Sequence, residues 1–238
     1  MSEPAPDPVP RLFSAALIAI GIYGLISAQF VAFWPPLVPA PSQMIWVSGA
    51  VSLLGGLGLQ WRTTARLAAG VLLVTLIVWL ALFKAPAILA APSIAASWES
   101  MAETAVIMAA LLCVFKGSIS IFAARLLFGV GVWTFGIAHF AYVAQTAALV
   151  PSWLPAHAAL VFFTGAVFVI SGTALVLGIA ARSFAILVAS QMGLFALLVW
   201  LPKILAGVHD VPTLSEFLDS ASLTAAAAVM ARSMWDRR

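Results

Sequence analysis

The chain has 238 residues, of which 64% are hydrophobic and only 8% are charged. A soluble domain carries roughly a quarter charged residues, and a mean hydropathy of +1.13 leaves too little polar surface to cover a globule in water. A soluble fold is therefore excluded. The net charge of only +3 argues against nucleic acid as a partner, and the single cysteine, Cys113, excludes an internal disulfide framework.

Residues 1–11 are rich in proline and lack the basic start of a signal peptide, so they are predicted to form a polar tail. Because a membrane-spanning helix needs about 20 apolar residues, the rest of the chain predicts about eight spanning helices. They are expected near residues 12–34, 44–60, 64–84, 100–116, 120–146, 155–179, 183–202 and 213–232. The predicted fold class is an all-α polytopic transmembrane helical bundle, with the lipid bilayer as its surroundings.

The basic residues are divided unevenly between the two ends of these helices. Nine of the eleven lie at one end: Arg11, Arg62, Arg66, Lys116, Arg125, Arg182, Arg232, Arg237 and Arg238. The outer loops hold the other two, Lys84 and Lys203, with the acidic residues Glu99, Glu103, Asp210, Glu216 and Asp219. This positive-inside bias predicts a multi-pass protein of the bacterial inner (plasma) membrane, with both termini in the cytoplasm.

Six tryptophans are predicted to lie at helix ends, where an interfacial aromatic belt would place them. They are Trp34, Trp46, Trp61, Trp98, Trp153 and Trp200.

The two halves of the chain resemble each other. Gly24 pairs with Gly136 at an offset of 112, and after a four-residue insertion Gly49 pairs with Gly165 at an offset of 116. Each half holds four predicted helices, so we expect two parallel repeats related by a pseudo-two-fold axis along the membrane normal. The predicted units are a first four-helix repeat, 12–118, and a second, 119–238.

The repeat unit has a recognisable order of motifs. The second half reads GIAHF at 136–140, VPSWLP at 150–155, TGAVFVISG at 164–172 and then Arg182. This order resembles the DoxX-like family of small four-helix membrane proteins, here as a tandem duplication. The resemblance implies a helical bundle and an association with membrane redox complexes, including quinone-linked ones. The acidic residue that family members often carry in the second helix is replaced here by Ser52 and Phe168, so its role is not transferred.

His139 is the principal candidate for chemistry inside the membrane. Tyr142 follows at i+3 on the same helical face, and the matching residues of the first half are Ser27 and Phe30, so only one half is polar here. An ionisable residue in a membrane helix indicates function. The alternative is a neutral histidine that joins two helices through a hydrogen bond to a carbonyl.

Two further residues complete the predicted ligand site. Gln191 lies in the seventh helix, within reach of His139 if those helices touch, although it equally suits simple helix adhesion. Trp153, in VPSWLP, forms part of a rim for an apolar ligand or else an interfacial helix cap. A quinone suits such a site. A bis-histidine haem does not, because His157 and His209 belong to outer loops, and the histidine spacing predicts no metal site.

Two pairs of carboxylates begin the fourth and eighth helices: Glu99 with Glu103, and Glu216 with Asp219. They are interpreted as complementing the helix dipole, with an access point for protons or cations as the alternative.

Three functions are weighed. The first is a non-catalytic accessory subunit of a redox- or quinone-linked membrane assembly, which binds other membrane subunits or a second copy. The second is a quinone or apolar-ligand site near His139 in an oxidoreductase component. The third is a small-solute or proton carrier. Whether the protein is an enzyme is left open, because no motif of a soluble enzyme is present.

Overall fold

A computed structural model describes residues 8–234, which form helices and their connections. The elements in chain order are α1 (Pro8–Ser27), α2 (Gln43–Leu59), α3 (Ala65–Trp79), the π-helical turn η1 (Leu80–Lys84), α4 (Ala85–Ala90), α5 (Ala95–Cys113), α6 (Ser118–Ala141), α7 (Val143–Ala147), α8 (His157–Leu177), α9 (Ala181–Phe195), the π-helical turn η2 (Ala196–Trp200), α10 (Leu201–Leu205) and α11 (Val211–Ser233).

Five of the described helices are long and apolar enough to cross a membrane: Val9–Ser27, Ala65–Ala90, Ser118–Ala141, His157–Leu177 and Ala181–Leu205. A shorter apolar helix covers Gln43–Leu59. The described residues thus form an all-α bundle, as predicted, with five helices that could cross a membrane, whereas the predicted count of about eight spans is not confirmed.

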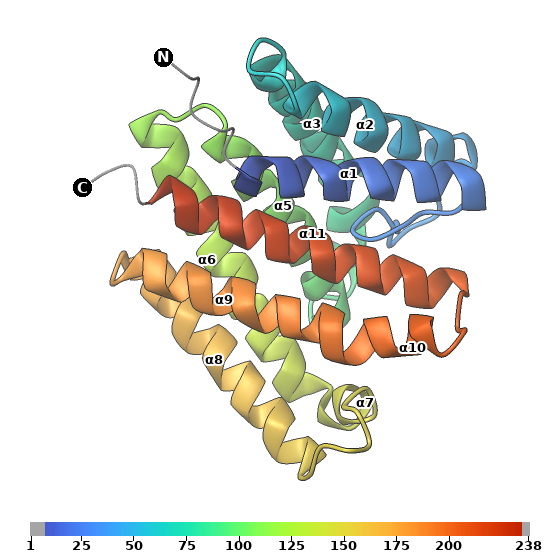
Figure 1. Cartoon of the computed structure of the whole chain (residues 1–238), viewed down its shortest axis with the longest axis vertical. Coiled ribbons are helices and arrows are strands. Elements are labelled where there is room, and N and C mark those ends of the chain that lie inside the picture. The colour runs from blue at the N-terminus through green and yellow to red at the C-terminus, as the bar shows by residue number, and fades with distance from the viewer. Residues whose placement is uncertain (1–7, 235–238) are drawn as a thin grey trace.

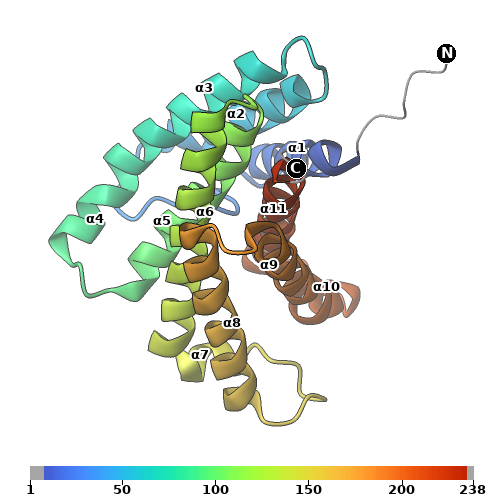
Figure 2. The same ribbon diagram turned by 90° about the vertical axis from the view of Figure 1, so that its left-hand side faces the viewer.

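Three predicted spans account for this difference: α2, which is shorter, and α5 and α11, which lie inside the bundle. Figure 1 shows α11 between α1 and α9, and α11 also packs against α5. The pair α2 and α3 lies on one flank and α8 on the opposite one, and α6 runs between them (Figures 1 and 2). Because neighbouring helices cover much of α5 and α11, these two need not be apolar along their whole length, and each carries two carboxylates.

Glycines allow α1 to cross α2, and α6 to cross α8, at close range. A Cβ added to Gly21 would lie only 2.4 Å from the backbone nitrogen of Leu53, and one added to Gly136 would lie 2.9 Å from that of Val169. Small residues let helix backbones approach in this way where lipid supplies no hydrophobic drive.

The two crossings use similar contacts. A Cβ on Gly21 would also lie 2.7 Å from the Gly49 carbonyl oxygen, and one on Gly136 would lie 2.7 Å from the Gly165 carbonyl oxygen. Gly24, which the sequence comparison pairs with Gly136, is less close to α2, since a Cβ there would lie 3.8 Å from the Gly49 Cα. The repeat and its alignment stay a prediction.

Pro86 does not end the third predicted helix. A proline ring clashes with the carbonyl four residues earlier, and the chain accommodates it with the π-helical turn η1, in which the Ala85 N–H bonds to the Leu80 carbonyl. The helix then continues to Ala90 rather than stopping at residue 84. As a result Lys84 remains inside the bundle. The turn η2 precedes a second proline in the same way.

The first helix ends at Ser27, seven residues before its predicted end, and the chain then passes through the core without regular structure. We call residues 31–34 the buried loop, because all four are buried, whereas residues 28–30, which lead to it, are exposed or half-buried. Ala28 and Ala32 have positive φ angles of 51° and 57°, which are uncommon for residues with a Cβ. Irregular backbone at membrane depth is tolerated only where protein surrounds it or a cavity adjoins it.

Trp34 lies in the core, so its predicted place in an interfacial belt is wrong. Its side chain is 1% exposed, its ring packs edge-on against Trp79 with centroids 5.0 Å apart, and its Nε1 donates a hydrogen bond to Ser52 Oγ at 2.7 Å. The early end of α1 turns the chain inward and carries Trp34 with it.

We expect Ser52→Ala to destabilise the protein by about 1–3 kcal/mol, because it leaves a buried indole N–H without an acceptor. Chemical unfolding of the purified protein in detergent measures this loss. The matched control is Ser190→Ala, whose exposed hydroxyl bonds only to the Ile186 carbonyl of its own helix. An equal loss in both variants would contradict the assignment.

Candidate functional site

Lys84 is completely buried, at 0% exposure. Its Nζ donates to the Phe33 carbonyl at 2.8 Å, to the Ser100 carbonyl and Oγ at 2.7 and 2.9 Å, and to Thr104 Oγ1 at 2.8 Å. An ammonium has three donors, so four neutral oxygens satisfy it fully. The predicted place of Lys84 in an outer loop is therefore wrong.

Two carboxyl groups accompany this lysine. Glu103 and Asp219 each stand eight residues after the first residue of their helices, α5 and α11. Both interact electrostatically with Lys84 and with each other. Asp219 is 7% exposed, and its Oδ1 has no hydrogen-bond partner in the described part of the chain. We call Lys84, Glu103 and Asp219 the triad; Lys84 and Asp219 are buried, and Glu103 is half-buried.

Two further carboxylates lie on the same helices, nearer to where these begin. Glu99 is half-buried and Glu216 is exposed, and both interact electrostatically with the triad. Neither helix has an acidic residue in its first turn, because α5 begins at Ala95 and α11 at Val211. The interpretation of these carboxylates as helix-dipole partners is therefore wrong. Together they extend the triad toward one end of the bundle.

The buried loop holds the triad between α5 and α11. The Ala32 N–H donates to Ser215 Oγ on α11 at 2.8 Å, while the Phe33 carbonyl accepts from Lys84 at 2.8 Å and from Thr104 on α5 at 3.3 Å. The loop thus supplies a backbone oxygen to the lysine and is itself fixed by both central helices.

Toward the opposite end, α5 and α11 are closed by apolar side chains. The residues that are 0% exposed there include Val106, Ile107, Leu111, Ala226 and Met230. The polar groups therefore connect the triad to only one end of these two helices.

His139 lies in an aromatic environment. Its ring stacks on Phe195 with centroids 5.9 Å apart and meets the ring of Phe168 edge-on at 5.3 Å. Its Nδ1 lies 2.8 Å from the Phe135 carbonyl of its own helix. Because a carbonyl only accepts, Nδ1 carries a proton, and in a neutral ring Nε2 keeps its lone pair.

The other three predicted ligand residues make contacts elsewhere. The Tyr142 hydroxyl accepts a hydrogen bond from the Ala96 N–H at 3.1 Å, since α6 ends at Ala141 and Tyr142 leaves the helical face. Gln191 Nε2 donates to the Thr164 carbonyl at 3.0 Å rather than to His139. Trp153 is 67% exposed. The four residues are therefore not joined into one polar site by these contacts.

Asp210 caps the N-terminus of α11. Its Oδ1 accepts a hydrogen bond from the Thr213 N–H at 2.8 Å, and bonds from the side chain and backbone of Thr213 lower the pKa of this carboxyl from its usual value. The ionised cap therefore stabilises the fold above the ordinary pKa of aspartate, and the contribution is lost as the pH falls through the lowered pKa.

We expect Asp210→Ala to lower the unfolding midpoint at neutral pH, and the gap from the wild type to close in acid as the carboxyl becomes protonated. Asp210→Asn keeps a capping oxygen, so at neutral pH it should stay close to the wild type. A gap that is constant over the whole pH range would contradict the capping role.

Among residues 8–234, no three or more His, Cys, Asp or Glu side chains gather as a metal ion would require. None of the protein-family models, curated proteins and solved structures compared with the chain matches it. The resemblance to the DoxX-like family thus stays a prediction.

The triad was not predicted as a site. One signal in the sequence pointed to it: LALFKAPAILA places Lys84 among apolar residues on both sides. In the predicted repeat the position at the offset of 116 is Trp200, so the prediction does not place a second lysine in the other half.

Proposed function

We propose that the protein is a proton carrier of the membrane, in which Glu103, Asp219 and Lys84 hold the transported proton. The observation that carries this proposal is a fully buried lysine beside two acidic side chains, one with a buried oxygen that lacks a partner.

Charge balance supports a proton in this place. One ammonium and two carboxylates leave a net negative charge, and an uncompensated charge away from water is costly. One proton shared between Glu103 and Asp219 restores neutrality. The unpartnered Oδ1 of Asp219 is an acceptor for it, and Lys84 is the fixed cation that stabilises the ionised state when the proton leaves.

The route has one open side in this conformation. Glu216 and Glu99 connect the triad to the end where α5 and α11 begin, while apolar residues close the other end. A carrier that alternates its access between two sides has one side closed at a time. The buried loop and the turn η1 are irregular elements that contact the triad, and such elements often mark functional sites in membrane helices.

The test is proton uptake into vesicles that contain the purified protein, a pH-sensitive dye and a high concentration of potassium. Valinomycin lets potassium leave down its gradient, and the resulting membrane potential drives protons into the vesicles. We expect the wild type to acidify the vesicles faster than empty vesicles do. Asp219→Asn and Glu103→Gln should each reduce the rate by roughly tenfold or more, as loss of a group that itself transfers the proton does.

The matched control is Asp210→Asn, which removes one carboxylate outside the triad and keeps the helix cap. It should transport at the wild-type rate. A folded wild type no faster than empty vesicles, or an Asp219→Asn protein with undiminished flux, would refute the proposal.

The accessory-subunit hypothesis, which is based on the absence of a connected polar set and on the family resemblance, stays a prediction. The contacts of Lys84 with Phe33, Ser100 and Thr104 form a connected polar set, and they favour the proton carrier.

The finer architecture belongs to the proposal as well. It comprises two four-helix repeats, α5 and α11 as further spanning helices, and termini on the cytoplasmic side. Two equal spacings support the repeats. The turns η1 and η2 lie 116 positions apart, and so do Glu103 and Asp219.

A further inference from the structure

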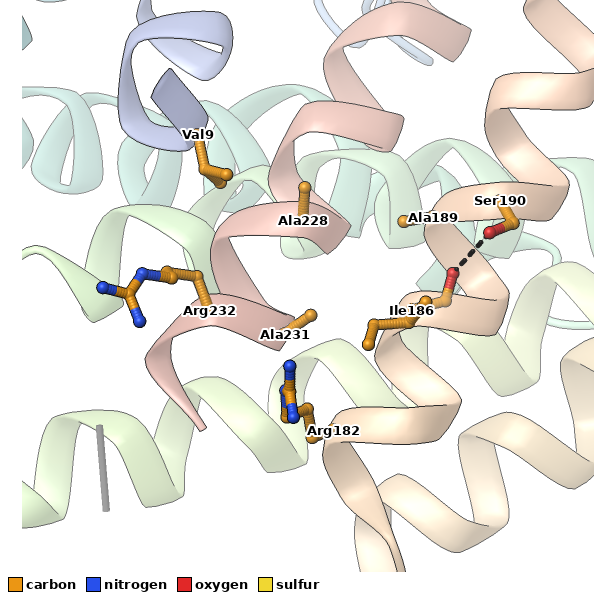
Figure 3. A pocket seen from close by; sticks show the side chains of 8 residues that line it. All are labelled: Val9, Arg182, Ile186, Ala189, Ser190, Ala228, Ala231 and Arg232. Carbon is orange, nitrogen blue, oxygen red and sulfur yellow. Dashed lines mark hydrogen bonds between the residues drawn. The ribbon is translucent and has the colours of Figure 1, made fainter. Parts of the chain in front are cut away.

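We infer that a groove across α11 binds an anionic phospholipid. This inference is independent of the proton site. The groove has a volume of about 560 Å³ and lies over α11 between the start of α1, at Val9, and the first half of α9, at Ile186 (Figure 3). Sites for small molecules commonly measure about 300–1,000 Å³.

The floor and walls of the groove suit a hydrocarbon chain. Ala228 and Ala231 present only methyl groups, so α11 is recessed between its two neighbours, and Val9 and Ile186 add apolar walls. Figure 3 shows Ile186 directed toward α11 from α9. A chain lying here would cover apolar surface of the central helix that α1 and α9 leave open.

One end of the groove is basic. Arg182 belongs to the first turn of α9 and Arg232 to the last turn of α11, and Figure 3 shows Arg182 pointing toward Ala231 while Arg232 lies on the other side of α11. Basic residues between helices at the membrane surface bind anionic lipid headgroups. A guanidinium also matches the geometry of a phosphate.

The start of α9 adds backbone donors at the same end. Its N-cap residue, Ala180, has no side chain that could accept from the first N–H groups, and such groups favour a phosphate. The combination of an apolar channel and a basic end matches a lipid with an acyl chain and a charged headgroup.

A second copy of the chain is a poorer occupant. A symmetric contact through this groove would bring two arginines of one copy toward the same two of the other, and juxtaposed like charges are costly.

The test measures binding of fluorescent phosphatidylglycerol and phosphatidylcholine to the full chain in neutral detergent, by anisotropy. We expect phosphatidylglycerol to bind roughly tenfold tighter or more, as basic headgroup sites favour anionic lipids. The double variant Arg182→Gln/Arg232→Gln should lose this preference. Ala228→Leu keeps both charges and fills the groove, so it should weaken binding of both lipids.

The control is Arg62→Gln/Arg66→Gln, which removes two exposed arginines outside the groove and should bind as the wild type does. Three outcomes would overturn the inference: equal binding of the two lipids by the wild type, an unchanged preference in the double variant, or no effect of Ala228→Leu together with full competition by inorganic phosphate. The last result would identify a site for the free anion.

Discussion

Replacing Lys84 with methionine should destabilise the protein by about 3–5 kcal/mol, because it leaves the buried Asp219 and the half-buried Glu103 without their cation. The change also removes the donor to the Phe33 carbonyl and to Thr104, so the buried loop loses its connection to α5 through the lysine. Proton uptake should fall to the level of empty vesicles. Chemical unfolding in detergent and vesicle acidification measure the two effects on the same preparation.

The double variant Lys84→Met/Asp219→Asn separates charge from packing. Removing one carboxylate together with the lysine should recover part of the lost stability without restoring transport. The matched control is Lys203→Met, whose ammonium lies 4.4 Å from the ring centre of Trp200 and which should cost only about 0.5–1 kcal/mol. A Lys84→Met protein as stable as Lys203→Met would show that the buried cation has no electrostatic role.

The second large effect is expected at the crossing of α1 over α2. Gly21→Ala should destabilise the protein by about 1–3 kcal/mol, because overpacking at a close contact forces the backbone to move. A Cβ at this position would lie 2.4 Å from the Leu53 nitrogen and 2.7 Å from the Gly49 carbonyl oxygen. Thermal unfolding in detergent provides the measurement.

Gly70→Ala is the control for this prediction. A Cβ on Gly70 meets nothing within 4 Å, so the change should be stabilising by about 0.5–1 kcal/mol, the usual gain of alanine over glycine in a helix. If the two variants shifted the unfolding temperature equally, close approach of the helices would not be the reason for Gly21.

Hydropathy located the helical segments well. All eight predicted segments start within five residues of the start of an observed helix, because lipid and the bundle core both select apolar residues over the length of a helix. The first segment was extended too far, to residue 34, since the buried loop is as apolar as the helix before it. Composition does not distinguish a spanning helix from irregular chain that a bundle encloses.

The site was harder to predict than the fold. A charged residue near the end of an apolar segment is assigned to a loop by default, and Lys84 stands two residues before a proline that normally marks a helix end. Its acceptors come from 51 positions earlier in the chain and from α5. Local sequence contains no information about such partners, whereas His139, between the apolar residues Ala138 and Phe140 of a predicted spanning helix, stood out at once.

The central claim is that Glu103 and Asp219 share an exchangeable proton beside Lys84. Infrared difference spectra of the full chain in vesicles, recorded through a pH titration in H₂O and D₂O, test it most directly. We predict a protonated-carboxyl band that appears and disappears with pH, shifts in D₂O, and is lost or altered in both Glu103→Gln and Asp219→Asn but retained in Asp210→Asn. A spectrum without such a band, or one that neither triad variant changes, would contradict the account.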